Sequence, residues 1–109
     1  MEGPIRFRLG QLAFTWDPEK AEANIRKHGA TFEEAATIWL DPLAIETFDA
    51  SHSGSEERWI RIGASLRATL LVVWSVERES GSEILVRIVG ARRANRREVE
   101  RYEEAGKGR

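Results

Sequence analysis

The chain contains 109 residues, of which 41% are hydrophobic and 32% charged, and it contains no cysteine. This length fits one small domain spanning residues 1–109. The lack of cysteine excludes disulfide bonds, thiolate zinc sites and cysteine nucleophiles. No apolar run approaches the roughly 20 residues that a membrane helix needs, and no secretory segment is recognisable. We therefore expect a cytoplasmic protein without a membrane partner.

The formal net charge of −1 hides an uneven distribution of charged residues. Residues 1–56 carry five basic and ten acidic side chains, whereas residues 57–101 carry ten arginines and six acidic side chains. Arginine binds phosphate through two parallel hydrogen bonds and keeps its charge near neutral pH. The second half is therefore compatible with a phosphate-binding face, although such charge runs often form only a solvated surface.

Hydrophobic periodicity and turn residues divide the chain into short elements. In chain order, the sequence predicts an extension over residues 1–11 that forms a short strand or an arm, a strand over 12–16, a helix over 18–28, a second helix from 32 to Asp41-Pro42, strands over 44–49, 58–64, 69–76 and 84–91, and a helix that follows Asn95 and ends at Gly106. A polar loop is predicted over residues 50–55 and a turn over residues 77–82.

Capping residues mark the helix boundaries. Asp17 precedes a proline at the start of the first helix, and Gly29 suits the left-handed conformation that ends it. Thr31-Phe-Glu-Glu34 and Asn95-Arg-Arg-Glu98 are capping boxes. Because the later strands follow one another through short connections, antiparallel pairing is expected. The predicted fold class is α+β: an antiparallel sheet of about four to five strands, with an N-terminal helical hairpin and a C-terminal helix.

Most catalytic motifs are missing from the sequence. It has no Gly-rich phosphate loop, no paired histidines at metal spacing and no Gly-x-Ser-x-Gly elbow, so we expect neither a metal nor a cofactor. What remains is His28 and the arginines on or beside the strands. Metal-free RNA cleavage needs a group that accepts the 2′-hydroxyl proton, a group that protonates the departing 5′-oxygen, and cations around the phosphate. The sequence permits this chemistry without selecting it.

Lys27 and His28 have two interpretations. Both end a predicted helix, where the helix dipole favours cations for purely structural reasons. His28 also falls on an apolar stripe with Ala21 and Ile25, so it is either a packed, hydrogen-bonded histidine or a proton-transfer group.

The arginines of the predicted strands also leave alternatives open. Arg58 and Arg61 point to opposite faces of a regular strand, so only one of them can face a substrate. Arg87 lies between apolar Val86 and Ile88, where an unpaired charge would be costly. It therefore forms either a structural salt bridge or a phosphate contact.

Four arginines surround the start of the last predicted helix, namely Arg92, Arg93, Arg96 and Arg97. Cations are unfavourable near a helix N-terminus, whereas its free amides attract phosphate. This local cost favours a functional role for these arginines. By contrast, the four tryptophans, Trp16, Trp39, Trp59 and Trp74, lie in predicted strands or on a helix stripe and are expected to pack in the core.

Many residues agree in order and spacing with a known family. In the first half they are Phe14-Thr-Trp-Asp17, Lys20, Asn24, Lys27-His28-Gly29, Phe32-Glu33, Ala35 and Asp41. In the second half they are Glu57-Arg58-Trp59, Ile62-Gly63, Arg87-Ile88, Ala91-Arg92, Glu98 and Tyr102-Glu103-Glu104. In these positions, which extend over residues 12–104, the chain resembles the BrnT family, the toxins of BrnT/BrnA type II toxin-antitoxin modules.

The resemblance implies a RelE-like fold and a metal-independent endoribonuclease that arrests growth by cutting RNA. It also implies a cognate BrnA-type antitoxin that neutralises the toxin and binds operator DNA, so that this chain reaches DNA only within the antitoxin complex. The alternative is a non-catalytic module of the same fold that binds the antitoxin or nucleic acid.

The resemblance also implies site residues. The family's catalytic candidates fall on Lys27, His28, Arg58, Arg87, Arg92 and Tyr102, and the further candidates for RNA binding are Arg61, Arg93 and Arg96. One position departs from the family pattern, because Gly90 stands where a small hydroxyl residue usually precedes Ala-Arg. The missing hydroxyl either removes a substrate contact or leaves activity unchanged.

Overall fold

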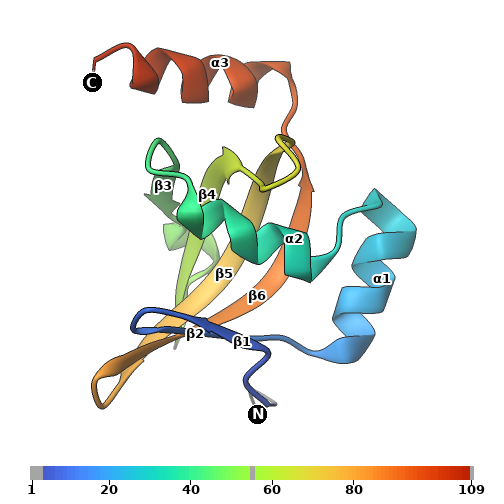
Figure 1. Cartoon of the computed structure of the whole chain (residues 1–109), viewed down its shortest axis with the longest axis vertical. Coiled ribbons are helices and arrows are strands. Elements are labelled where there is room, and N and C mark those ends of the chain that lie inside the picture. Colours follow the sequence, from blue (N-terminus) through green and yellow to red (C-terminus); the bar gives the residue numbers. More distant parts are fainter. Residues whose placement is uncertain (1–3, 55, 109) are drawn as a thin grey trace.

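The computed structural model describes residues 4–54 and 56–108, which form an α+β fold (Figure 1). In chain order the elements are β1 (Phe7–Leu9), β2 (Leu12–Thr15), α1 (Pro18–His28), α2 (Phe32–Ala36), a 3-10 helix (Thr37–Leu40), β3 (Ile45–Phe48), a 3-10 turn (Ala50–His52), β4 (Glu57–Ala64), β5 (Leu70–Ser80), β6 (Glu83–Arg93) and α3 (Arg96–Gly106). The predicted helical hairpin and C-terminal helix are confirmed.

The strands form one six-stranded sheet in the order β1-β2-β6-β5-β4-β3. The prediction of four to five antiparallel strands is therefore wrong in two respects. The N-terminal extension adds strand β1, which pairs with β2 across a tight turn where Gly10 has a φ of +60°. In addition, β2 pairs with β6 in parallel, with Phe14 opposite Val86. Sequence patterns missed this pairing because its partners lie at opposite ends of the chain.

Several element boundaries also differ from the sequence expectation, and the second predicted helix is α-helical only to Ala36 and continues as a 3-10 helix. Residues 77–82 are not a long turn, because β5 continues to Ser80 and β6 begins at Glu83. Gly81 closes this hairpin with a φ of +62°, a conformation that glycine adopts without steric cost. Of the predicted polar loop 50–55, the first three residues form a 3-10 turn. Ser55 and residues 1–3 of the extension lie outside the described residues.

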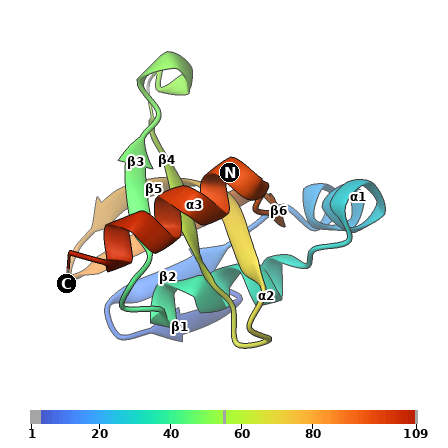
Figure 2. The same cartoon turned by 90° about the horizontal axis from the view of Figure 1, so that it is seen from above.

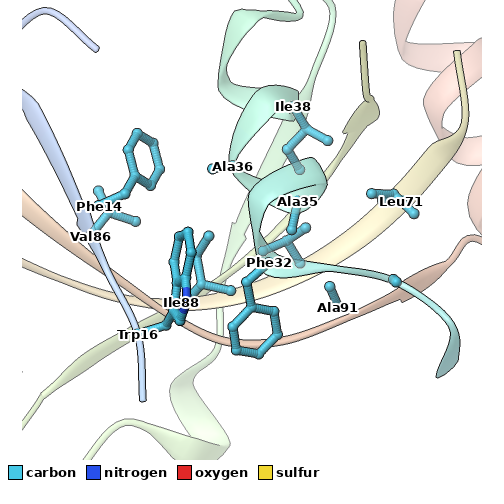
Figure 3. Close-up of a cluster of buried hydrophobic side chains, with 12 residues drawn as sticks. Phe14, Trp16, Phe32, Ala35, Ala36, Ile38, Leu71, Val86, Ile88 and Ala91 are labelled. Carbon is cyan, nitrogen blue, oxygen red and sulfur yellow. The ribbon is translucent and has the colours of Figure 1, made fainter. Parts of the chain in front are cut away.

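Helix α2 and the 3-10 helix cover one face of the sheet, α1 lies at the side of the sheet next to β6, and α3 runs across one end of it (Figure 2). The core lies between the sheet and the helical hairpin (Figure 3). Its largest fully buried side chains there are Phe14 and Ile88 from the strands and Phe32 and Ile38 from α2 and the 3-10 helix. Burying a side chain of this size stabilises a fold by about 1.5–3 kcal/mol. Helix α2 and the 3-10 helix are thus held to this face mainly by apolar contacts.

The tyrosine of α3 anchors that helix to the sheet. The hydroxyl of Tyr102 donates a hydrogen bond of 2.6 Å to Oδ2 of Asp41. The same carboxylate oxygen accepts a hydrogen bond of 2.8 Å from the backbone N–H of Ala64 at the end of β4. Among the described residues, no helix has the length and apolar character required to cross a membrane.

Candidate functional site

The sheet face opposite α2 carries three of the predicted site arginines. Cross-strand register places Arg58, Val76 and Arg87 opposite one another on β4, β5 and β6. Side chains two residues apart in a strand point to the same face, so Trp74 and Val72 of β5 share the face of Val76. The cross-strand partner of Val72 on β6 is Arg92, which therefore lies on this face as well. We call this surface the arginine face and define it by Arg58, Trp74, Arg87 and Arg92.

A β-bulge brings the two arginines of β6 to this one face. Side chains five residues apart in a regular strand point to opposite faces, so Arg87 and Arg92 would be separated. The register shifts between Trp74 and Ser75, because Trp74 pairs with Gly90 whereas Ser75 pairs with Ile88. One extra residue is thereby inserted into β6, and the alternation changes phase beyond it.

Arg58 and Arg87 lie on either side of buried Val76. The aliphatic part of an arginine side chain can cover such an apolar residue while its charged end stays at the surface. Arg87 forms an ion pair of 2.9 Å with Glu56, whose side chain is 53% exposed. Such exposed pairs contribute about 0–1 kcal/mol, so Arg87 can exchange this partner for a phosphate at little cost. Nε of Arg58 is buried and has no hydrogen-bond partner among the described residues.

Arg92 is held more firmly than Arg87. Its two terminal nitrogens each donate a hydrogen bond of 2.8 Å to the carboxylate of Glu98, and its guanidinium lies 5.2 Å from the ring centroid of Trp74. Glu98 also completes the capping box of α3 by accepting from the backbone N–H of Asn95. The hydrogen bond from Arg92 lowers the pKa of Glu98, and the same bond raises the pKa of Arg92.

A pocket of about 310 Å³ adjoins the arginine face where α1 packs beside β6. We call it the α1 pocket; it is lined by Lys20, Lys27 and His28 of α1 and by Trp74, Val89 and Gly90 of the sheet. The structure thus brings the predicted Lys27-His28 pair next to the arginine face. Basic side chains of α1 and the ring of Trp74 thus line the same pocket.

The expected apolar stripe of the first helix is wrong in its outer members. Ile25 is 45% exposed and His28 is also exposed, so His28 is not a packed core histidine. The buried residue of α1 is instead Asn24. Gly29, with a φ of +70°, ends the helix, and the basic residues of its last turn, Arg26, Lys27 and His28, are exposed.

Asn24 attaches α1 to the sheet beside this pocket. Its side-chain nitrogen donates 2.8 Å and 2.9 Å hydrogen bonds to the carbonyl oxygens of Ala91 and Ala30, and its side-chain oxygen accepts from the backbone N–H of Ala91 at 3.1 Å. Strand β2 reaches only the level of Arg87. The amide of Asn24 therefore satisfies the backbone of β6 beyond the end of β2, as a neighbouring strand would.

Arg61 lies on the helix-covered face, opposite to Arg58, as the alternation of the strand predicts. It forms an ion pair with Glu46 on β3, and its guanidinium lies 4.6 Å from the ring centroid of Trp39. Burial raises the pKa of nearby Glu77, with a further contribution from Glu46, while the charge of Arg61 opposes the shift. These contacts give Arg61 a place in the packing of the fold.

The other predicted site residues lie around α3. Arg93 and Arg96 are exposed at the end of β6 and the start of α3, respectively. Tyr102 is half-buried against Asp41 and is not among the residues of the arginine face. Together, the structure gathers Lys27, His28, Arg58, Arg87 and Arg92 around one face, and it places Arg61 on the other.

Sequence reasoning missed three residues of this region. Trp74 was expected in the core but is only half-buried and lines the α1 pocket. Asn24 carries no pattern of its own, because one polar residue in an amphipathic helix does not reveal an inward orientation. Glu98 was expected as a cap, and that role is confirmed, but its pairing with Arg92 depends on the tertiary fold. Trp16 packs in the core as expected, being only 4% exposed, whereas Trp39 and Trp59 are half-buried like Trp74.

Among the described residues, no group of three or more His, Asp or Glu side chains is arranged to hold a metal ion. The arginine face and the α1 pocket bring cationic side chains and an imidazole to one region of the surface. Arginine and lysine side chains stabilise negative charge, and an exposed imidazole can transfer protons near neutral pH.

Comparisons with known proteins identify a matching family. The family model described as the ribonuclease toxin BrnT of type II toxin-antitoxin systems matches residues 16–98. Among solved structures, the chain is similar to the ribonuclease toxin BrnT of Brucella abortus, with 23% sequence identity and a TM-score of 0.49 over 74% of this chain and 94% of that chain. A search of curated proteins found no match. Because the family model covers most of its length, the chain belongs to the BrnT family of ribonuclease toxins of type II toxin-antitoxin systems.

Proposed function

We propose that this chain is a metal-independent endoribonuclease that arrests growth by cutting RNA. The observation that carries the proposal is the convergence of separate elements on one surface. Strands β4 and β6 supply Arg58, Arg87 and Arg92 to the arginine face, and α1 places Lys27 and His28 at its edge. This surface combines a proton-transfer group with several fixed cations, which is what RNA cleavage without a metal requires.

In the proposed reaction, the 2′-oxygen of one nucleotide forms a bond with the adjacent phosphorus while the bond from phosphorus to the 5′-oxygen breaks. One group accepts the 2′-hydroxyl proton, and another supplies a proton to the departing 5′-oxygen. His28 is exposed and suited to one of these transfers. The products are a 2′,3′-cyclic phosphate and a 5′-hydroxyl end.

The arginines stabilise the charge that develops on the phosphate. Arg87 is the main phosphate ligand in this proposal, because its partner Glu56 is exposed and weakly held. Arg92 contributes from a fixed position, since Glu98 and Trp74 orient it. Lys27 and Arg58 assist at the two sides of the site.

The proposed partner is a cognate BrnA-type antitoxin that neutralises the toxin and carries the DNA-binding part of the complex. A toxin of a type II system has an antitoxin partner, and the family description places this chain in such a system. The proposal includes a RelE-like fold for the single domain and action in the cytoplasm, where RNA is available. Operator DNA is bound only through the antitoxin.

The proposal is tested by RNA cleavage and growth arrest with His28→Ala, Arg87→Ala and Arg92→Ala, each with folding checked by circular dichroism. We expect the wild type to cleave RNA in the presence of EDTA and to leave cyclic phosphate ends, and each variant to lose most of this activity. Arg26→Ala is the matched control, because Arg26 precedes Lys27 in α1 but pairs with exposed Glu22. Full activity in all three folded variants would show that the site assignment is wrong.

A further inference from the structure

Trp74 is set apart from the other tryptophans by its surroundings. Trp16 packs edge-on against Phe32 in the core, and half-buried Trp39 packs edge-on against Phe14 at the border of the core. Trp74 lies instead on the arginine face and contacts no aromatic ring among the described residues; like Trp16 and Trp39 it has an arginine over its ring, here Arg92 at 5.2 Å. A half-buried ring that has no aromatic partner and lies beside exposed cations is poorly explained by core packing.

Gly90 leaves the ring of Trp74 uncovered on the side of β6. The two residues are direct cross-strand partners, and such partners normally cover one another on a sheet face. A Cβ atom added to Gly90 would lie 3.8 Å from Cε3 of Trp74, at ordinary contact distance. A larger side chain at this position would therefore fit the backbone and lie against the ring.

The uncovered ring forms one wall of the α1 pocket, and the opposite wall is basic. Lys20, Lys27 and His28 line the pocket together with Trp74 and Gly90. Its volume of about 310 Å³ is within the range of small-ligand sites. A flat apolar surface facing several cations matches a nucleotide, since a base stacks on aromatic rings and the phosphate pairs with lysine.

We propose that Trp74 is the stacking platform for one unpaired RNA base next to the cleaved phosphate, and that Gly90 keeps this platform open. This inference rests on the proposed function and adds a binding subsite to it. The guanidinium of Arg92 lies over the indole ring and holds it in place, and Glu98 fixes this guanidinium in turn. Only a base that has left its helix reaches such a ring, so the subsite selects single-stranded RNA.

Binding to a non-cleavable probe tests the subsite independently of catalysis. The probe is a short single-stranded 2′-deoxy oligonucleotide, which lacks the attacking hydroxyl, and its dissociation constant is measured by fluorescence anisotropy. Losing one base–aromatic stack weakens binding by about 10- to 100-fold, so we expect this loss for Trp74→Leu. Trp74→Phe keeps an aromatic face and is expected to recover most of the affinity. Trp59→Leu is the control, because Trp59 packs on Phe48 instead of lining the α1 pocket.

Probes with a single abasic position separate stacking from a structural role of Trp74. One abasic position should weaken wild-type binding to the level of Trp74→Leu, and it should have no further effect on that variant. Gly90→Val should weaken binding in the same way without lowering the thermal stability, because the added side chain covers the ring. In cleavage assays, Trp74→Leu should raise KM more than it lowers kcat.

The outcomes distinguish the two proposals. If folded Trp74→Leu binds the probe as tightly as the wild type, the stacking subsite is overturned while the cleavage proposal stands. If no abasic position reproduces the loss seen with Trp74→Leu, stacking is also overturned. If the wild type binds the probe with the predicted Trp74 dependence but cleaves no RNA, the proposed catalytic function fails and the binding subsite is retained.

Discussion

The arginines on the two faces of the central sheet have different partners. On the helix-covered face, Arg61 is paired with Glu46 and stacked on Trp39 beneath the 3-10 helix. On the arginine face, Arg58 has no ion-pair partner among the described residues, and Arg87 has only an exposed glutamate. Nε is buried without a hydrogen-bond partner there in both Arg58 and Arg61, so this atom does not distinguish the two faces. The comparison shows that the count of arginines does not locate a site. Arg61 and Arg92 are each paired with a glutamate and lie against a tryptophan ring, whereas Arg58 has no ion-pair partner among the described residues and Arg87 has an exposed one.

The largest expected effect is a loss of stability on the helix-covered face. Phe32→Ala removes a fully buried ring from the contact between α2 and the sheet. Truncating a buried phenylalanine costs about 3–5 kcal/mol, which is a large fraction of the stability of a small domain. Urea denaturation measures the change. A loss below about 1 kcal/mol would contradict the view that this face holds the fold.

A change on the arginine face should instead reduce activity. Arg87→Ala is expected to lower kcat for RNA cleavage by about 100-fold or more, the usual effect of removing one group that stabilises transition-state charge. The free energy of unfolding should change by less than about 1 kcal/mol, because the pair with Glu56 is exposed. Single-turnover cleavage and urea denaturation on the same sample provide the comparison.

Glu56→Gln is the matched control for this prediction. It removes the partner of Arg87 without removing the cation, so cleavage should stay at the wild-type level or rise. A strong loss of cleavage in Glu56→Gln would show that the ion pair itself is needed, and Arg87 would then belong to the same class as Arg61.

Asn24 joins the two regions, and its replacement should affect both moderately. Asn24→Ala leaves the backbone N–H and carbonyl of Ala91 without their side-chain partner. Unsatisfied buried groups of this kind cost about 1–3 kcal/mol. Because α1 carries Lys27 and His28, cleavage should also fall while the sheet stays intact. Glu22→Ala, at an exposed position of the same helix, should change neither quantity, as measured by thermal unfolding and cleavage.

The smallest expected effect is the pH dependence of the stability that the Arg92–Glu98 pair contributes. The hydrogen bond from Arg92 lowers the pKa of Glu98 in the folded protein, relative to about 4.3 for an unperturbed glutamate. The stability that this pair contributes is therefore fully present above the unfolded pKa and is lost as the pH falls through the lower folded value.

Glu98→Gln should remove this part of the pH dependence. The variant is expected to be less stable than the wild type at pH 7, and the difference should shrink as the pH decreases below about 4. Thermal unfolding of both proteins across this pH range measures the effect. A difference that stays constant down to pH 2 would contradict the assigned role of the Arg92–Glu98 pair.

Local signals allowed much of the fold to be predicted. The caps at Asp17, Thr31 and Asn95 act through bonds to residues two or three positions away, so the sequence contains these interactions. The capping box predicted at Thr31 forms only in half, because the carboxylate of Glu34 accepts a hydrogen bond from Ser65 on a distant part of the chain. The parallel pairing of β2 with β6 depends on partners about seventy residues apart, and short-range patterns carry no information about it. The site was predicted only in part for the same reason.

The bulge illustrates what the sequence could not provide for the site. Without the extra residue near Trp74, strict alternation would place Arg87 and Arg92 on different faces. Neither arginine shows this shift in its local sequence. The inward orientation of Asn24 and the outward position of Trp74 likewise follow from how α1 meets the edge of β6.

The most direct test compares Arg58→Ala with Arg61→Ala, two changes on β4 that remove the same side chain from opposite faces of the sheet. The measurement is the RNA cleavage rate per folded molecule, with the free energy of unfolding determined on the same samples. Our account predicts that Arg58→Ala loses most of its cleavage and keeps its stability. Arg61→Ala should cleave normally when folded but lose about 1–2 kcal/mol of stability. Normal cleavage by Arg58→Ala together with lost cleavage by folded Arg61→Ala would contradict the account.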